Sequence, residues 1–455
     1  MVPSSRLLIW VAAACLPAAL LLVAAPAAGA PVALLWSAFA AVAVADAALA
    51  PRRLRKITVV LPTLVRLTHD LAGELEMRIA GVGGALDLRI APVLPVDLEA
   101  VSPVAEVHLT RASPSGASGD DSRGVAPAAR ATISCTPRRR GLFRIEACRI
   151  ECSSPFGFWR ARREVAVDCE VRAYPNLLSE RRHVPALFLY RGRAGAHRQQ
   201  QVGKGREFER LRDYLPGDSY EDVDWKATAR RGKPVTKLFQ VERTQEVYVL
   251  VDASRLSARP SGGADETPVP ALERMIRAAL VLAVAAERQG DLFGLVTFGD
   301  RVHSFLRARA GASHFQACRE ALFALSPQSS SPDFVELASF LRSRLRRRAL
   351  LVVLTDLDDP LLAESFERAA ELLRRQHLLL VCALRPADVA PIFSRPVQNS
   401  GDLYRELAGH LRWQDQRDLG RALERRGVSY AALPAETLSA EVVSRYAAIK
   451  QRQLL

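Results

Sequence analysis

The C-terminal half contains two short apolar segments, VYVLV (247–251) and LLVVLT (350–355), each followed at once by an aspartate. A strand that is apolar on both sides needs cover on both faces, which the crossover helices of a parallel sheet provide. Segments with apolar residues at three- and four-residue spacing occur among the strands, for example ALERMIRAALVLAVAAERQ (271–289). Residues 246–455 are therefore predicted to form a Rossmann-like α/β domain around a parallel sheet.

The aspartates that follow these segments give the first indication of a site. Open α/β sheets bind ligands at the carboxyl ends of their strands. Asp252 and Asp356 both occupy such positions in the predicted sheet. A second strand is predicted at 290–299 with a hairpin partner at 301–308, and a long helix at about 412–426. We therefore expect a binding rim where the strands end.

The N-terminus carries two apolar runs, Leu7–Val23 and Val32–Leu49, separated by the turn sequence APAAGAP. Each run is about long enough to cross a bilayer core of roughly 30 Å. A cleaved signal peptide would not be followed at once by a second spanning segment. Residues 1–54 are therefore predicted to form a transmembrane helical hairpin. Arg6 and Arg52 flank it, so the positive-inside rule places both ends in the cytoplasm and the protein in the inner (cytoplasmic) membrane, multi-pass with two helices.

Residues 55–175 show a different pattern, in which short runs such as ELEMRIA (74–80) and LFRIEACRIE (142–151) alternate apolar and polar residues. This period of two predicts strands with one buried face, and about seven of them favour an all-β, sandwich-like domain. The seven cysteines show no metal-ligand spacing, which indicates free thiols in a reducing compartment.

The charge composition bears on whether the chain binds nucleic acid or membrane lipid. The 63 Lys and Arg residues exceed the 49 Asp and Glu residues, giving a net charge of +14. Basic residues such as those of RSRLRRR (342–348) have no interleaved aromatics, so we expect no nucleic-acid partner. Anionic membrane lipid explains the excess better, since basic segments beside a membrane helix are attracted to it.

Residues 176–245 form the most distinctive segment, predicted to be a linker ahead of the α/β domain. The segment mixes charges, a Pro-Gly turn, a lone Trp and an Ala-Arg pair at fixed places. It resembles the bacterial membrane-protein family named domain of unknown function 58, although Glu221 stands where that family often has a basic residue. The resemblance is carried by Gly205, Glu207, Leu211, Arg212, Tyr214, Pro216, Gly217, Asp218, Trp225, Ala229, Arg230 and Glu242.

The α/β segment is similar to von Willebrand factor A (vWA) domains. Those domains hold a divalent cation, usually Mg²⁺, through an Asp-x-Ser-x-Ser loop, a Thr and a further Asp. Mg²⁺ requires hard oxygen ligands in a near-octahedral array. Asp252, Ser254 and Asp356 match this set, while Leu256 replaces the second Ser and the second loop offers Ser331 or Asp333 instead of a Thr. The resemblance thus implies a degenerate metal site, with Mg²⁺ or metal-free protein binding left open.

The resemblance also implies a partner, since relatives of this family are commonly linked with MoxR-type AAA+ ATPases. The chain is thus expected to be a membrane-anchored cytoplasmic adaptor in protein complex assembly or maturation. A structural, self-associating envelope protein and a metal-dependent hydrolase remain as alternatives. We expect a non-enzymatic protein, because the sequence has no Ser-His-Asp arrangement and no phosphate-binding loop. The predicted partner-binding residues are Asp252, Ser254, Asp333 and Asp356 on the rim, and Trp225, Arg212, Asp218 and Arg230 in the linker segment.

Overall fold

The computed structural model describes residues 1–24, 29–55, 57–80, 86–109, 129–178, 180, 202–215, 219–240, 245–262, 269–394 and 396–452. The contacts divide the chain into two compact units, Met1–Asn176 and Leu177–Leu455. Each unit has its own hydrophobic core, so each is described separately.

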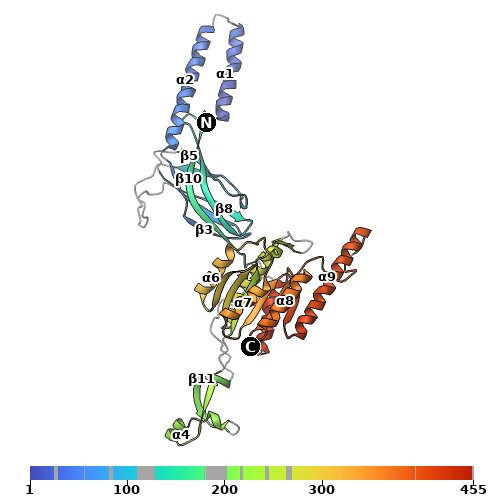
Figure 1. Cartoon of the computed structure of the whole chain (residues 1–455). Coiled ribbons are helices and arrows are strands. Elements are labelled where there is room, and N and C mark those ends of the chain that lie inside the picture. The colour runs from blue at the N-terminus through green and yellow to red at the C-terminus, as the bar shows by residue number, and fades with distance from the viewer. Residues whose placement is uncertain are drawn as a thin grey trace. The chain divides into compact units, whose positions relative to one another are not determined.

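The first unit begins with two helices, α1 (Ser5–Ala24) and α2 (Gly29–Leu54), which are coloured blue in Figure 1. Among the described residues, one helix is long and apolar enough to cross a membrane, and it spans Gly29–Arg52 in α2. The apolar part of α1, Ser5–Leu20, is shorter. The structure thus contains one candidate membrane helix, and the predicted crossing by both helices is not confirmed.

The rest of this unit is built from strands in two sheets. One sheet has the order β1-β10-β9-β5-β7, with β3 pairing in parallel with β10, and the other has the order β2-β4-β8-β6. The strands are β1 (Val2–Pro3), β2 (Thr58–Val60), β3 (Leu64–Thr68), β4 (Gly73–Ala80), β5 (Leu86–Pro92), β6 (Leu98–Ala100), β7 (Ala105–Leu109), β8 (Ala129–Pro137), β9 (Gly141–Ser153) and β10 (Trp159–Tyr174).

Period-two alternation produces the core of this unit. In β4, Leu75, Met77 and Ile79 are buried, and the residues between them are partly exposed. Buried side chains of both sheets, together with Ala50 and Leu54 of α2, form one hydrophobic cluster. The end of α2 is therefore part of the core of the β-rich unit.

The distinctive segment ahead of the α/β domain folds around a hairpin of β11 (Val202–Asp213) and β12 (Val235–Gln240), with the short helices η3 (Tyr220–Asp222) and α4 (Trp225–Arg231) between them. Asp224 caps α4 by accepting a hydrogen bond from the Ala227 backbone N at 3.0 Å. Gly232 ends it with φ of +65°, a conformation that favours glycine. We call this hairpin with its helices the hallmark module.

The α/β domain contains a six-stranded sheet of order β17-β16-β13-β18-β19-β20. All neighbours pair in parallel except β17, which is antiparallel to β16 at the edge. The strands are β13 (Glu246–Asp252), β16 (Leu292–Phe298), β17 (Val302–Arg309), β18 (Leu350–Thr355), β19 (Leu378–Arg385) and β20 (Ser429–Pro434). A two-stranded sheet of β14 (Pro260–Ser261) and β15 (Val269–Pro270) precedes the first helix.

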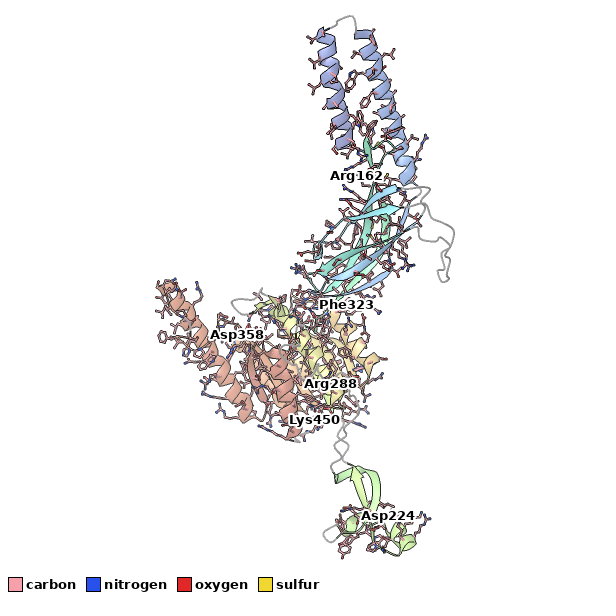
Figure 2. The ribbon with its side chains drawn as sticks, turned by 180° about the vertical axis from the view of Figure 1, so that it is seen from behind. Arg162, Asp224, Arg288, Phe323, Asp358 and Lys450 are labelled. Atoms are coloured by element: carbon pink, nitrogen blue, oxygen red, sulfur yellow. The ribbon has the colours of Figure 1, made fainter. Side chains whose placement is uncertain are left out.

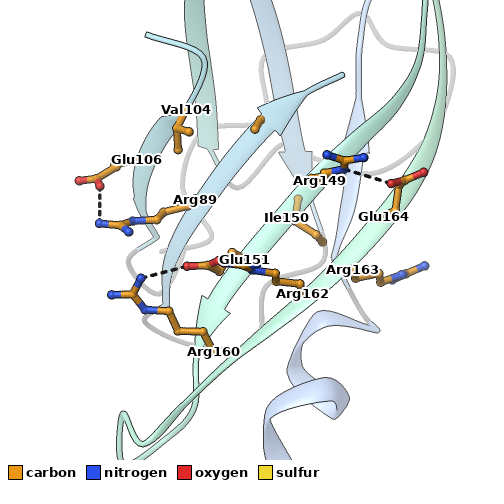
Figure 3. Close-up of a pocket in the computed structure, with 11 residues that line it drawn as sticks. Arg89, Val104, Glu106, Arg149, Ile150, Glu151, Arg160, Arg162, Arg163 and Glu164 are labelled. Atoms are coloured by element: carbon orange, nitrogen blue, oxygen red, sulfur yellow. Dashed lines mark hydrogen bonds and ion pairs between the residues drawn. The ribbon is translucent and has the colours of Figure 1, made fainter. Parts of the chain in front are cut away.

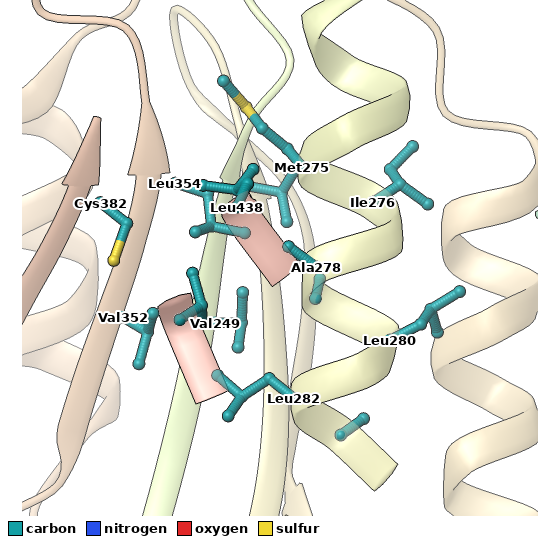
Figure 4. Packing of buried hydrophobic residues seen from close by; sticks show 14 of the residues in the cluster. Val249, Met275, Ile276, Ala278, Leu280, Leu282, Val352, Leu354, Cys382 and Leu438 are labelled. Atoms are coloured by element: carbon teal, nitrogen blue, oxygen red, sulfur yellow. The ribbon is translucent and has the colours of Figure 1, made fainter. Parts of the chain in front are cut away.

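Helices cover both faces of this sheet, which explains why its strands are apolar on both sides. The helices are α5 (Ala271–Arg288), α6 (Ala312–Phe323), α7 (Phe334–Arg344), α8 (Pro360–Leu373), α9 (Ser400–Arg425) and α10 (Leu438–Gln451). Val249, Val352 and Leu354 pack with Met275 of α5 and Leu438 of α10 on one face (Figure 4). The alternate strand residues pack against α7, α8 and α9 on the other face. The predicted Rossmann-like domain with a parallel sheet is present, with β17 as the hairpin partner of β16.

Candidate functional site

The candidate site lies where the chain changes direction across the sheet. From β13 the chain first builds β16 and β17 on one side and then returns to start β18 on the other. Ligands of open α/β sheets bind at such a switch point, beyond the carboxyl ends of the strands. Asp252 ends β13 and Thr355 ends β18, so both residues lie at this switch point.

Asp252 joins the two central strands. Its Oδ2 accepts a hydrogen bond from Thr355 Oγ1 at 2.6 Å, and its Oδ1 accepts one from the Ser254 backbone N at 2.8 Å. The side chain is completely buried, and this burial raises the pKa of the carboxyl group above its ordinary value, against the lowering effect of both hydrogen bonds. Asp252 is therefore held firmly inside the domain rather than presented on its surface.

Asp356 is paired with a cation from the chain itself. Its Oδ2 accepts a hydrogen bond from Arg259 Nη1 at 3.0 Å, and its Oδ1 accepts one from the Asp358 backbone N at 3.0 Å. Burial raises the pKa of Asp356, and the nearby Arg259 guanidinium opposes that rise. The side chain of Arg259 is 44% exposed, so its positive charge reaches solvent at the strand-end rim.

Asp358, in the same loop as Asp356, is paired with an arginine of α9. Figure 2 labels Asp358. Arg412 Nε donates to Asp358 Oδ2 at 3.0 Å, and Arg412 Nη2 makes a shorter bond to the same oxygen. Arg412 Nη1 reaches Asp388 Oδ2 at 2.8 Å, and the pKa of Arg412 is raised chiefly by its hydrogen bond to Asp358. A cation from α9 thus neutralises the acidic loop after β18.

The loop before α7 completes the rim. Asp333 caps α7 by accepting hydrogen bonds from the backbone N of Val335 at 3.0 Å and of Glu336 at 2.9 Å. Arg255 Nε donates to Ser331 Oγ at 3.0 Å, which ties this loop to the loop after β13. Asp333 is exposed, but its Oδ1 serves the helix cap.

The oxygen set on the rim does not fit a Mg²⁺ ion. Ser254 Oγ is buried, and the Ser254 side chain helps to lower the pKa of the neighbouring Asp252. The carboxylates are not free, because Asp252 bonds Thr355 and Asp356 bonds Arg259. Leu256 is buried and supplies no oxygen. Within the described part of the chain, no group of three or more His, Cys, Asp or Glu side chains is placed to hold a metal ion.

Three of the predicted residues of the distinctive segment lie in the hallmark module, namely Arg212, Trp225 and Arg230. Trp225 begins α4 with 67% of its surface exposed, and Arg230 is exposed near the end of the same helix. Arg212 lies in β11 and is partly buried. Asp218, the remaining predicted partner-binding residue of this segment, lies outside the described residues.

Sequence reasoning missed the residues that neutralise the rim. Arg259 and Thr355 lie within a few positions of the predicted loops, but each bonds an acid on the other loop, Asp356 and Asp252 respectively. Arg412 and Asp388 lie far along the chain from Asp358. No local pattern pairs them, since only the docking of α9 brings Arg412 near that acid.

The strand order, the antiparallel edge strand and the acids at the switch point define a vWA-like α/β domain, joined here to a β-rich unit and a candidate membrane helix. Residues 210–390 match the model of the family described as "Protein of unknown function DUF58". The resemblance found in the sequence is thus confirmed over this part of the chain.

The "Uncharacterized protein YeaD" of Bacillus subtilis (strain 168) is 29% identical over 106 residues. The match covers 23% of this chain and 23% of that protein, so it spans less than a quarter of the relative's length.

Solved structures that resemble the chain include two bacterial proteins. One is an aerotolerance-related membrane protein from Bacteroides fragilis NCTC 9343, 19% identical, covering 44% of this chain and 97% of that chain with a TM-score of 0.28. Another is the conserved hypothetical protein BatB from Bacteroides thetaiotaomicron, 16% identical, covering 45% and 99% with a TM-score of 0.27.

Proposed function

We propose that this chain is a membrane-anchored cytoplasmic scaffold whose vWA-like domain binds another protein, and that it is not an enzyme. The observation that carries the proposal is the internal pairing of the rim acids. Asp252, Asp356 and Asp358 each bond a hydroxyl, a backbone N or an arginine of the same chain. Acids held in this way are suited to shaping a rigid binding surface, whereas a hydrolase needs carboxylates free to act on water.

The anchoring part of the proposal has both α1 and α2 crossing the inner membrane as a hairpin. Exposed apolar side chains on both helices support it, among them Leu16 of α1 and Leu34 of α2. Arg6 at the start of α1 and Arg52 at the end of α2 favour a cytoplasmic location for both ends. The β-rich unit and the α/β domain would then both be cytoplasmic.

The proposed rim works without a metal. In a vWA domain with Mg²⁺, the cation bridges to a carboxylate of the partner. Here the half-exposed guanidinium of Arg259, held by Asp356, offers a positive charge at the rim. A guanidinium binds a carboxylate through two parallel hydrogen bonds. We therefore propose that a partner Asp or Glu pairs with Arg259, close to the rim acids Asp356 and Asp358.

The proposed partner is a MoxR-type AAA+ ATPase, as the family resemblance implies. The exposed Trp225 and Arg230 on α4 provide a second candidate contact, since aromatic and arginine side chains are enriched at protein interfaces. Self-association of the chain as an envelope protein is the competing proposal. The two differ in whether the partner at the rim is the ATPase or a second copy.

A photocrosslinking amino acid placed at Ser331 tests the proposal in the full-length, membrane-embedded protein. With the co-expressed ATPase present, we expect a crosslink to the ATPase from Ser331. The matched control is Gln289, which follows α5 and precedes β16, at the amino ends of the strands. Crosslinks from both positions, from neither, or only between copies of the chain would contradict recognition of the ATPase at the rim.

Arg259→Glu sharpens this test, because it reverses the charge offered to the partner. Loss of the Ser331 crosslink to the ATPase is expected, with the membrane fraction unchanged. An undiminished crosslink would remove Arg259 from the interface.

A further inference from the structure

The turn between β9 and β10, taken here with the first residue of β10 as residues 154–159, is attached to the candidate membrane helix. Asp46 of α2 is completely buried and accepts hydrogen bonds from Ser154 Oγ at 2.5 Å and from the backbone N of Phe156 at 3.0 Å. Trp159 Nε1 donates to the carbonyl oxygen of Ala43, also in α2, at 2.8 Å. These bonds fix the position of the turn along the helix.

The position along α2 sets the depth of this turn. Asp46 lies six residues before Arg52, the last residue of the candidate span. Six residues of helix correspond to roughly 9 Å, so the turn lies near the boundary of the hydrocarbon core. Phe156 is 61% exposed there, and its ring stacks on Phe158. Trp159 lies next to this pair and is partly exposed, and tryptophan is enriched at the membrane interface.

A hollow of about 770 Å³ opens on the same sheet, between strands β5, β9 and β10 (Figure 3). Arg163 connects it to the end of α2, because its Nη1 donates to the carbonyl oxygens of Leu54 at 2.9 Å and of Arg55 at 3.2 Å. The arginines that line the hollow are Arg89, Arg149, Arg160, Arg162 and Arg163.

The charges around this hollow do not balance. Three glutamates line it against five arginines. Glu151 is shared by Arg160 at 3.4 Å and Arg162 at 2.7 Å, so one carboxylate serves two guanidinium groups. Glu106 pairs with Arg89, and Glu164 pairs with Arg149. Two positive charges therefore remain in excess, close to the end of a candidate membrane helix.

We propose that this hollow binds the phosphate of an anionic phospholipid head group from the bilayer that α2 enters. Arginine is suited to this role because its planar guanidinium binds phosphate oxygens through two hydrogen bonds. The location next to the last turn of α2 favours a lipid phosphate over a free one. The inference rests on the proposed membrane anchoring and is independent of the partner of the vWA-like domain.

Native mass spectrometry of the full-length protein, extracted from phosphatidylglycerol–phosphatidylcholine bilayers, tests this proposal. We expect the wild type to retain phosphatidylglycerol in preference to phosphatidylcholine. The double variant Arg160→Gln/Arg162→Gln is expected to lose that preference by about tenfold, since each basic residue near a lipid surface contributes measurably to the attraction. Arg347→Gln/Arg348→Gln, in the exposed basic run of the α/β domain, is the matched control and should retain it.

Glu151→Gln is expected to change the retention of phosphatidylglycerol in the opposite direction. It keeps all five arginines and frees Arg160 and Arg162, so retention of phosphatidylglycerol should rise. Inorganic phosphate added to the extracted protein should not displace the lipid. Equal losses in the double variant and its control, or no rise with Glu151→Gln, would overturn the proposal. Carbonate extraction of the same membranes reports anchoring separately, so failure of the lipid site and failure of the anchor are distinguishable.

Discussion

Asp252→Ala is expected to lower the free energy of unfolding of the α/β domain by about 2 to 4 kcal/mol, because each buried donor left unsatisfied costs about 1–3 kcal/mol. The two donors are Thr355 Oγ1 and the Ser254 backbone N, and both residues are buried. Urea unfolding of the fragment Leu177–Leu455 measures the change, since the two cores of the domain contain only residues of this unit.

Asp252→Asn is the matched variant, because it keeps an acceptor oxygen and removes the charge. Burial raises the pKa of Asp252, so the folded state binds its proton at pH values where the unfolded chain has already released it. Stability is then lost as pH rises above the ordinary carboxyl pKa. The stability of wild type relative to Asp252→Asn should therefore decrease as the pH rises above about 4, the ordinary value for this carboxyl group. A difference that is constant with pH, or a cost below about 1 kcal/mol for Asp252→Ala, would contradict the buried hydrogen-bonding role.

Asp46→Ala is expected to release the turn between β9 and β10 from α2. The substitution removes the acceptor for Ser154 Oγ and for the backbone N of Phe156 and Phe158. Hydrogen bonds to a charged group contribute about 1.5–3 kcal/mol each, and the three bonds act together. We expect the amides of Phe156 and Phe158 to exchange with solvent roughly a hundredfold faster, which corresponds to local opening that is easier by about 3 kcal/mol.

Hydrogen exchange of the full-length protein in detergent measures this effect. Ser37→Ala is the control, because Ser37 Oγ bonds only the Leu34 carbonyl oxygen within the same helix among the described contacts. It should leave the exchange of residues 154–159 unchanged. Unchanged exchange in Asp46→Ala would mean that Asp46 does not hold the turn, and the depth assigned to the lipid-binding hollow would lose its basis.

The α/β domain could be predicted because its strands have a recognisable pattern in the local sequence. Strands that are buried on both faces have continuous apolar sequences, and the aspartates after VYVLV and LLVVLT mark the strand ends. The beginning of α9 was missed, since the helix starts at Ser400 rather than near Arg412. Its first turns expose Leu403 and Leu407, so burial does not impose the usual amphipathic pattern on them.

The site was predictable only in part, for a physical reason. Local sequence places Asp252 and Ser254 on one loop and Asp356 on another, but it does not say which cation meets them. Arg259 reaches Asp356 across 97 positions of the chain, and Arg412 reaches Asp358 across 54. The role of Asp46 was missed in the same way, because its partners in the turn at 154–159 lie more than a hundred positions away.

Calorimetric titration of Mg²⁺ and Mn²⁺ into the fragment Leu177–Leu455 tests most directly whether the rim recognises its partner without a metal. The pairing of Asp356 with Arg259, and the absence of an oxygen ligand at Leu256, predict no heat of binding and no thermal shift at micromolar to low-millimolar concentrations of either ion. Saturable binding in that range, lost in Asp252→Ala when the variant is tested at a temperature where it remains folded, would contradict the account and would establish a metal-bridged interface in its place.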